Sequence, residues 1–201
     1  MGSSTATADG TPVFVVTGPS GAGKGTLIKA LLERRPELQV AVSATTRLQR
    51  RGEVDGREYW FLTDAEFVRR VDRGDFLEHV TYVSGKRYGT LRSEVDRIAA
   101  AGRVPVLELE TEGALTVKEQ LPRGVTIFIT APIRELERRL RERASESEGE
   151  IGERIGLARN QLEQADEFDY VVLNDDLARA TRELEEIVRR ELAPAGSMSR
   201  P

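Results

Sequence analysis

One glycine-rich stretch has the residue types and spacing to bind phosphate. It lies between an apolar run at 13–16 and a helix-like segment at 27–32, and it consists of Gly18, Pro19, Ser20, Gly21, Ala22, Gly23, Lys24, Gly25 and Thr26. Glycines allow backbone N–H groups to converge on phosphate oxygens, and a helix N-terminus adds partial positive charge. The lysine supplies a full charge to the β- and γ-phosphates. The flanking strand and helix patterns therefore favour a P-loop for a nucleoside triphosphate over an ordinary turn with a surface lysine.

The residue after the lysine departs from the usual P-loop pattern. That pattern has Ser or Thr there, with its hydroxyl on Mg²⁺, whereas this chain has Gly25 followed by Thr26. Gly-Lys-Gly-Thr resembles the loop of nucleoside monophosphate kinases, in which phosphates and waters hold more of the metal. We therefore expect Mg²⁺ to bind through ATP phosphates and waters, and we assign it no direct protein ligand.

A second segment has the side chains to hold another phosphate. Arg47 and Arg50 lie three residues apart, beside Thr45, Thr46 and the nearby Tyr59. Two guanidinium groups and tyrosine hydroxyls are suited to grip a phosphate dianion at two edges. Taken alone, the segment is equally compatible with a solvated basic loop, which is what most arginine clusters are.

The elements that must position these residues alternate along the chain. Strands are predicted at 13–17, 38–42, 104–110, 126–130 and 170–173. Helices are predicted at 24–34, 92–101, 113–120, 133–143, 152–166 and 177–192. Runs of Val, Ile and Leu between helices indicate an α/β fold with a parallel five-stranded sheet covered on both faces. Ligands of such sheets gather at the carboxyl ends of the strands, so the motif residues should converge there.

Two segments interrupt this alternation. The segment 43–91 is too long for a simple connection, and its pattern predicts a small inserted subdomain of short strands with one helix near 64–73. The segment 139–154 is rich in Arg and Glu and contains Ser145, Ser147 and Gly149, which indicates a charged, mobile lid. The remaining segments, 12–42, 92–138 and 155–192, are the predicted core.

Composition excludes several kinds of site. A length of 201 residues with 39% hydrophobic and 32% charged residues fits one globular domain. With no cysteine and only one histidine, His79, the chain cannot form disulfides, thiolate metal sites or multi-histidine metal sites. The net charge of −4 argues against a nucleic-acid partner. No apolar run approaches the ~20 residues that cross a bilayer, which argues against a membrane protein.

The ends of the chain are predicted to be loose. Residues 1–11 are small and polar and lack the features of a secretory signal, so we expect a flexible leader there and a flexible tail at 193–201. The absence of cysteine is compatible with a cytoplasmic protein. The sequence leaves monomer and homo-oligomer equally open.

The order and spacing of several motifs resemble those of guanylate kinases. These motifs are the P-loop, the segment 43–59, Phe76-Leu77-Glu78, Tyr88-Gly89-Thr90, and the segments 107–114, 139–148 and 174–177. The resemblance covers nearly the whole chain except its two ends, and it implies a P-loop NTPase-type domain at 12–192 whose insertion binds GMP. It also implies transfer of the γ-phosphoryl group of ATP to GMP, which gives ADP and GDP, with Mg²⁺ accompanying ATP.

The resemblance assigns roles by position. The implied catalytic residues are Lys24, Arg47, Arg143 and Arg154. The implied ATP contacts are residues 18–26 together with Arg139 and Asn174. The implied GMP contacts are Ser43, Arg47, Arg50, Tyr59, Glu78, Tyr88, Gly89, Thr90 and Glu110. Within this set, the two arginines and two tyrosines are the implied contacts of the GMP phosphate, and Ser43, Glu78 and Thr90 are the implied contacts of the base.

The chemistry of these residue types agrees with the assignment. Guanine offers N1–H and an exocyclic amine to a carboxylate such as Glu78, and its O6 can accept from Ser43 and Thr90. Adenine presents a lone pair at N1, and a site built for one pattern can reject the other by ~10⁴ or more. Because the second pKa of a phosphate monoester is near ~6, GMP is already an anionic nucleophile and needs no catalytic base. Catalysis then consists of positioning and charge stabilisation, with the lid arginines closing on the transferring group.

Some residues depart from the pattern of the resembled family or stand outside the site. Gln49 and Arg51 replace prolines on either side of Arg50, which predicts a more flexible loop, and Glu110 stands where aspartate is common. His79 is predicted to be structural, and Trp60 and Phe61 are predicted to pack rather than to stack on a base.

Two other functions share parts of this pattern. A kinase acting on AMP, UMP or another nucleotide would share the P-loop, but it gives no reason for Ser43, Glu78 and Thr90 together. A non-catalytic protein-binding module of the same fold typically lacks P-loop or acceptor-site residues, whereas this chain retains Lys24 and Arg47.

Overall fold

The structure is a computed structural model that describes residues 11–82, 84–143 and 148–193. The side chains of residues 143–151 are not part of the description. The predicted leader and tail, apart from residues 11 and 193, lie outside the described residues. The same holds for Ser145 and Ser147 of the predicted lid and for the side chain of Arg143.

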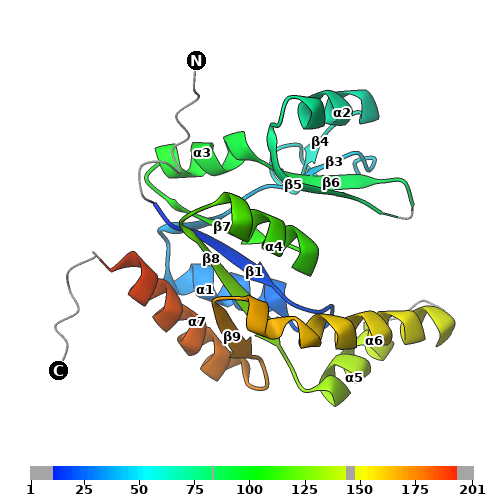
Figure 1. The fold of residues 1–201 in the computed structure, drawn as a ribbon, viewed down its shortest axis with the longest axis vertical. Helices are drawn as coiled ribbons and strands as arrows, with labels where there is room; N and C mark the ends of the chain where they lie inside the picture. Colours follow the sequence, from blue (N-terminus) through cyan, green and yellow to red (C-terminus); the bar gives the residue numbers. More distant parts are fainter. Residues whose placement is uncertain (1–10, 83, 144–147, 194–201) are drawn as a thin grey trace.

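A parallel sheet of five strands forms the centre of the molecule (Figure 1). The strand order is β2 (Leu38–Val40), β7 (Val104–Glu108), β1 (Val13–Thr17), β8 (Gly124–Thr130) and β9 (Tyr170–Leu173). Every neighbouring pair is parallel, which confirms the predicted sheet. The central strand β1 is buried along its whole length, as its continuous apolar run requires between two helical layers.

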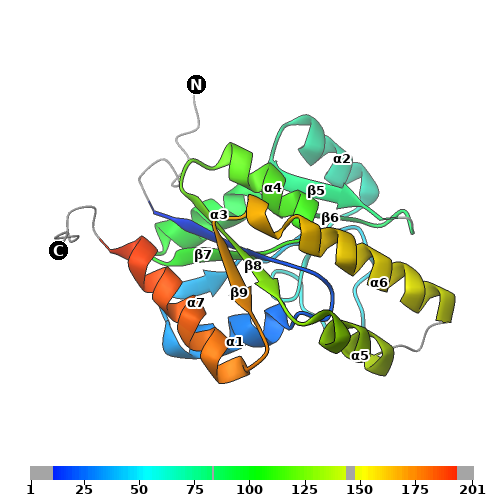
Figure 2. The same ribbon diagram turned by 60° about the horizontal axis from the view of Figure 1, so that its bottom comes forward.

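Helices cover both faces of this sheet (Figures 1 and 2). One layer contains α1 (Lys24–Arg34) and α7 (Leu177–Leu192), and the other contains α3 (Arg92–Ala100) and α4 (Thr111–Gln120). Phe14 and Val16 of β1 belong to a core cluster with residues of α1 and α7. Val13 and Val15 belong to a cluster with residues of α3 and α4. The alternation of side chains along one strand therefore divides the core into two layers.

Several element boundaries differ from the predicted ones. β2 ends at Val40 rather than at residue 42, since the N–H of Val42 donates to the buried carboxylate of Glu94 at 3.0 Å instead of joining the sheet. β7 ends at Glu108 rather than at residue 110, and α4 begins at Thr111 rather than at residue 113, because the carbonyl of Glu110 already accepts a helical hydrogen bond from Ala114. The helix predicted at 152–166 is α6 (Glu148–Glu163), which is followed by a short 3₁₀ turn, Ala165–Glu167.

The segment 43–91 forms a second sheet beside the first. Its strand order is β4 (Trp60–Phe61), β3 (Ala44–Thr45), β6 (Arg87–Leu91) and β5 (Phe76–Thr81), with the single helix α2 (Asp64–Asp72). Phe67 of α2 stacks on Phe76 with ring centroids 4.4 Å apart, and both belong to a small separate core. Short strands and one helix were predicted here. β5 packs beside α4, which places the second sheet next to the carboxyl end of β7.

A pair of helices stands beyond the carboxyl end of β8 (Figures 1 and 2). α5 (Ile133–Arg143) follows this strand after two residues, and α6 packs along it. Both helices carry residues of the predicted lid. Within the described part of the chain, every helix is too short or too polar to span a membrane.

Candidate active site

The P-loop joins the carboxyl end of β1 to α1, and its glycines are required by close packing. Gly18 has a φ of 134° and Gly23, the residue before α1, has a φ of 86°, both in the region that favours glycine. A Cβ atom on Gly18 would overlap the carbonyl oxygen of Ile129, and one on Gly23 would lie 2.5 Å from Nδ2 of Asn174. The loop therefore presses directly against β8 and the residue that follows β9.

Lys24 lies at the first position of α1 with its ammonium group turned back over the loop. Its Nζ donates to the carbonyl oxygens of Gly18 at 2.7 Å and Pro19 at 3.3 Å. Burial lowers the pKa of Lys24, and the negative charges of Glu110 and Glu108 oppose that shift. The ammonium is thus held where it closes the loop and faces two carboxylates.

Glu108, at the carboxyl end of β7, was missed from the sequence. Its carboxylate oxygens lie 3.8 Å and 4.0 Å from the position that a Cβ atom on Gly25 would take. Burial raises the pKa of Glu108, and the Lys24 charge opposes this rise. Its place at the end of a central parallel strand is the signal that could have identified it. Among the described residues, no group of three or more His, Cys, Asp or Glu side chains is arranged to hold a metal ion.

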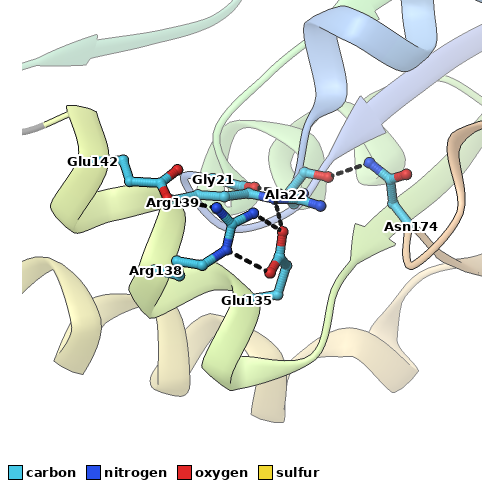
Figure 3. Close-up of polar contacts among 7 residues, drawn as sticks. All are labelled: Gly21, Ala22, Glu135, Arg138, Arg139, Glu142 and Asn174. Carbon is cyan, nitrogen blue, oxygen red and sulfur yellow. Dashed lines mark hydrogen bonds and ion pairs between the residues drawn. The ribbon is translucent and has the colours of Figure 1, made fainter.

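Two predicted ATP contacts reach the P-loop from either side (Figure 3). Arg139 of α5 donates from Nη1 to the carbonyl of Gly21 at 3.1 Å, and buried Asn174 donates from Nδ2 to the carbonyl of Ala22 at 2.7 Å. Glu135, one helical turn before Arg139, accepts from its Nε at 2.8 Å. Hydrogen bonds from Arg138 and Arg139 lower the pKa of Glu135 to about 2. Glu135, also missed from the sequence, therefore stays ionised and fixes the direction of the Arg139 guanidinium.

At the other end of the site, Glu78 and Thr90 face each other across β5 and β6. The Thr90 hydroxyl donates to Oε1 of Glu78 at 2.8 Å, so in this arrangement it orients the carboxylate, which differs from the implied direct contact with the base. Burial raises the pKa of Glu78, and the bond from Thr90 opposes this rise. Gly113 of α4 leaves room for the carboxylate, since a Cβ atom there would lie 3.1 Å from Oε2 of Glu78.

Gly89 and His79 are explained by packing within the second sheet. A Cβ atom on Gly89 would lie 2.7 Å from the carbonyl oxygen of Glu78 and 2.9 Å from the Phe76 ring, so only glycine allows β5 and β6 to approach this closely. The His79 ring meets Phe67 and Phe76 edge-on, with centroids 6.3 Å and 6.0 Å apart. This contact agrees with the structural role predicted for His79.

Arg47 is brought together with both predicted phosphate-binding tyrosines. Its guanidinium carbon lies 5.3 Å from the centroid of the Tyr59 ring and 5.7 Å from that of Phe61. Tyr59 meets Tyr88 edge-on at 5.9 Å. The hydrogen bond that Arg47 donates to Glu53, the charge of Glu53 and the hydrogen bond with Tyr88 raise the pKa of Arg47, so its charge is permanent. Arg50 lies at the exposed end of the same loop.

One cleft of about 1910 Å³ connects the P-loop with the second sheet. Ser20 and Lys24 line it at one end, and α6 contributes Arg154. The predicted GMP contacts in its lining are Ser43, Tyr59, Glu78, Tyr88, Gly89 and Glu110. The predicted contacts Arg47, Arg50 and Thr90 are not among the described residues that line it; Arg47 adjoins the cleft through Tyr59, and Thr90 through Glu78.

Tyr82 is a further residue of this cleft that sequence reasoning missed. It lines the cleft after β5 and meets the Tyr88 ring edge-on at 5.3 Å. Burial, followed by the charge of Glu110, raises the pKa of Tyr82 to about 12, so its hydroxyl stays protonated at neutral pH. Tyr82 follows β5 directly, and none of the motifs that the sequence analysis singled out includes it.

This chain is similar to known proteins over a range that includes both the P-loop and the residues that line the cleft. A family model described as guanylate kinase matches residues 10–191. The guanylate kinase of Rubrobacter xylanophilus is 47% identical over 90% of this chain and 95% of that protein, and that of Synechocystis sp. is 45% identical over 89% and 94%. Among solved structures, the guanylate kinase from Anaplasma phagocytophilum matches with a TM-score of 0.69 and 28% identity, covering 90% of this chain and 86% of that one.

Proposed function

The chain belongs to the guanylate kinase family and transfers the γ-phosphoryl group of ATP to GMP, and we propose that the two ends of its cleft divide the two nucleotides between them. The observation that carries this proposal is that Lys24 of the P-loop and Glu78 of the second sheet line the same cleft. A triphosphate held at Lys24 and a base held at Glu78 leave the reacting phosphates between them. The two ends then bring donor and acceptor together within one cleft.

At the donor end, the P-loop N–H groups and the N-terminus of α1 bind the ATP phosphates. The Lys24 ammonium has three N–H donors, so it can exchange loop carbonyls for phosphate oxygens while it stays charged. Support for this role comes from its hydrogen bonds to Gly18 and Pro19, which hold it directly over the loop. Arg139 and Asn174, which bond to the loop from either side, are proposed to border the rest of ATP.

At the acceptor end, Glu78 accepts hydrogen bonds from guanine, and Arg47, Arg50, Tyr59 and Tyr88 hold the GMP phosphate. An oxygen of that phosphate attacks the γ-phosphorus of ATP, the bond from this phosphorus to the β–γ bridging oxygen breaks, and ADP leaves while GDP forms. The attacking oxygen is already anionic, so no residue has to remove a proton. Arg154, which lines the cleft, is proposed to stabilise the charge of the transferring group; the same role for Arg143 stays a prediction, since its side chain lies outside the described residues.

The donor end also fits Mg²⁺. This ion prefers oxygen ligands and retains several waters, and the carboxylates of Glu108 and Glu110 lie close enough to Lys24 to affect its pKa. We propose that Glu108, which faces the position of Gly25, holds the waters of an ion bound to the ATP phosphates. When bound, the ion supplies positive charge to the β- and γ-phosphate oxygens.

The cellular location and the partners of the protein are proposed from its composition. The absence of cysteine supports a cytoplasmic location, and the net charge of −4 supports nucleotides rather than nucleic acid as the partners.

A substrate panel tests the assignment of the acceptor. ADP formation is measured by a coupled assay with GMP, AMP, UMP and dTMP at equal concentration. We expect turnover with GMP and at least ~10³-fold lower kcat/KM with AMP, because the carboxylate of Glu78 would face the lone pair at N1. Comparable turnover on AMP would contradict the assignment. The variant Glu78→Gln is expected to raise the KM for GMP and to leave the KM for ATP unchanged.

A further inference from the structure

One acidic residue, Glu53, joins the parts of the loop that carries Arg47 and Arg50. Its Oε1 accepts from Nη2 of Arg47 at 2.7 Å, and its Oε2 accepts from the backbone N–H of Arg50 at 2.8 Å. Its own N–H donates to the carbonyl of Arg50 at 3.1 Å. We propose that Glu53 is a positioning residue that sets both arginines for the acceptor phosphate, an inference that rests on the proposed function of this loop.

The hydrogen bond to Glu53 and the contacts around it fix the orientation of the Arg47 guanidinium. Nη1 donates to the carbonyl of Leu48 at 2.7 Å while Nη2 donates to Glu53, and the rings of Tyr59 and Phe61 lie 5.3 Å and 5.7 Å from its carbon. A guanidinium has five N–H donors, so these two bonds leave Nε and one N–H on each terminal nitrogen for the Tyr88 hydroxyl and a phosphate. An arginine fixed in this way loses less rotational freedom when the phosphate binds.

The backbone of the loop is closed around the same residue. Nε2 of Gln49 donates to the carbonyl oxygen of Glu53 at 2.6 Å, across the turn that contains Arg50 and Gly52. The resemblance predicts a more flexible loop because Gln49 and Arg51 stand where prolines are common. A proline has no side-chain donor, so Gln49 supplies a connection that the common residue cannot. Arg51, the other departure, is exposed.

A carboxylate beside a phosphate site could act in two ways, and the hydrogen bonds distinguish them. If Glu53 simply occupied the place of the phosphate, only the side chain of Arg47 would need to bind it. Instead its second oxygen binds the backbone of Arg50, which no phosphate-mimicking role requires. The hydrogen bonds from Arg47 and Arg50 lower the pKa of Glu53, so both of its oxygens remain acceptors at neutral pH. The arrangement therefore favours positioning over competition.

The test compares the affinities of GMP and guanosine, which differ only in the phosphate. Calorimetry is performed on the full chain, on Glu53→Gln and on Glu53→Ala, together with kcat and both KM values. We expect Glu53→Gln to bind GMP ~10-fold more weakly, because the ion pair with Arg47 is lost and a glutamine offers only one acceptor oxygen for the two donors, and Glu53→Ala to bind it more weakly still. Guanosine affinity and the KM for ATP should stay within ~2-fold of the unaltered chain.

Glu66→Gln is the matched control, since Glu66 also pairs with two arginines, Arg69 and Arg70, which lie on the same helix α2. It should leave GMP affinity within ~2-fold. Unchanged GMP affinity in both Glu53 variants would overturn the inference. Tighter GMP binding in Glu53→Gln would show competition instead, and equal weakening of guanosine and GMP would show a purely structural role. If the unaltered chain binds guanosine as tightly as GMP, the proposed phosphate site itself fails, whatever the variants do.

Discussion

Replacing Gly113 with alanine should separate helix stability from recognition of the acceptor base. Gly113 lies in the first turn of α4, where a Cβ atom would stand 3.1 Å from Oε2 of Glu78 and 3.5 Å from its Cδ and Cγ atoms. A methyl group at 3.1 Å from an oxygen is closer than ordinary van der Waals contact, so the carboxylate must shift by a few tenths of an ångström. That shift occurs at the group proposed to bind guanine.

The magnitude follows from the hydrogen bonds at risk. A hydrogen bond to a charged group contributes ~1.5–3 kcal/mol, so the loss of one bond to the base should lower kcat/KM for GMP by ~10- to 150-fold. The helix itself should not suffer, because alanine is ~1 kcal/mol more favourable than glycine inside a helix. Gly113→Ala should therefore keep or raise the free energy of unfolding while it impairs the use of GMP.

The assay measures KM and kcat for each nucleotide, with urea unfolding of the same preparations. Gly156→Ala is the control, because Gly156 lies on α6 and a Cβ atom there would meet nothing within 4 Å. It should gain up to ~1 kcal/mol of stability with unchanged kinetics. If Gly113→Ala folds normally and uses GMP as well as the unaltered chain does, the place of Glu78 beside the base is refuted.

Three further predictions concern the P-loop and the pH dependence. Lys24→Ala should lower kcat by at least ~10³-fold with an unchanged circular dichroism spectrum; retained turnover would remove Lys24 from the mechanism. Gly18→Ala should lose more than ~3 kcal/mol of stability in urea unfolding, because its φ of 134° is strained for alanine and its Cβ atom would overlap the Ile129 carbonyl oxygen. Burial raises the pKa of Glu78 above its ordinary 4.5, so its carboxylate takes up a proton at a higher pH than an exposed glutamate does. Since the protonated form cannot accept from both guanine donors, guanosine, which has no phosphate of its own to titrate near ~6, should bind more weakly as the pH falls towards 4.5 from above, and Glu78→Gln should abolish this dependence; an identical pH profile in that variant would count against it.

The central sheet and the P-loop could be predicted because their signals are local. The run Val13-Phe14-Val15-Val16 is buried on both faces, so it shows no polar alternation and identifies itself as a central parallel strand. The glycine-rich loop and the helix that follow complete the pattern within residues 13–34. Such features need no knowledge of the rest of the chain.

What was missed depends on partners distant in the sequence. Glu135 and Arg139 have the spacing of a helical ion pair, but the purpose of that pair becomes clear only from the Gly21 carbonyl, 118 residues away. The end of β2 was placed too late because the apolar pattern continues to Val42, while the competing acceptor is Glu94 on another element. Glu53 was given no role from the sequence, because a single sequence does not show that one carboxylate bonds to both Arg47 and Arg50.

The second sheet contains its own optical probe. Trp60 is the single tryptophan of the chain, and the Gly56 backbone approaches it so closely that a Cβ atom would lie 2.8 Å from its indole ring. The next residue, Phe61, lies beneath the guanidinium of Arg47. Movement of this loop as a ligand arrives should therefore alter indole emission without any attached dye, and rapid mixing could time the arrival of the acceptor separately from that of the donor.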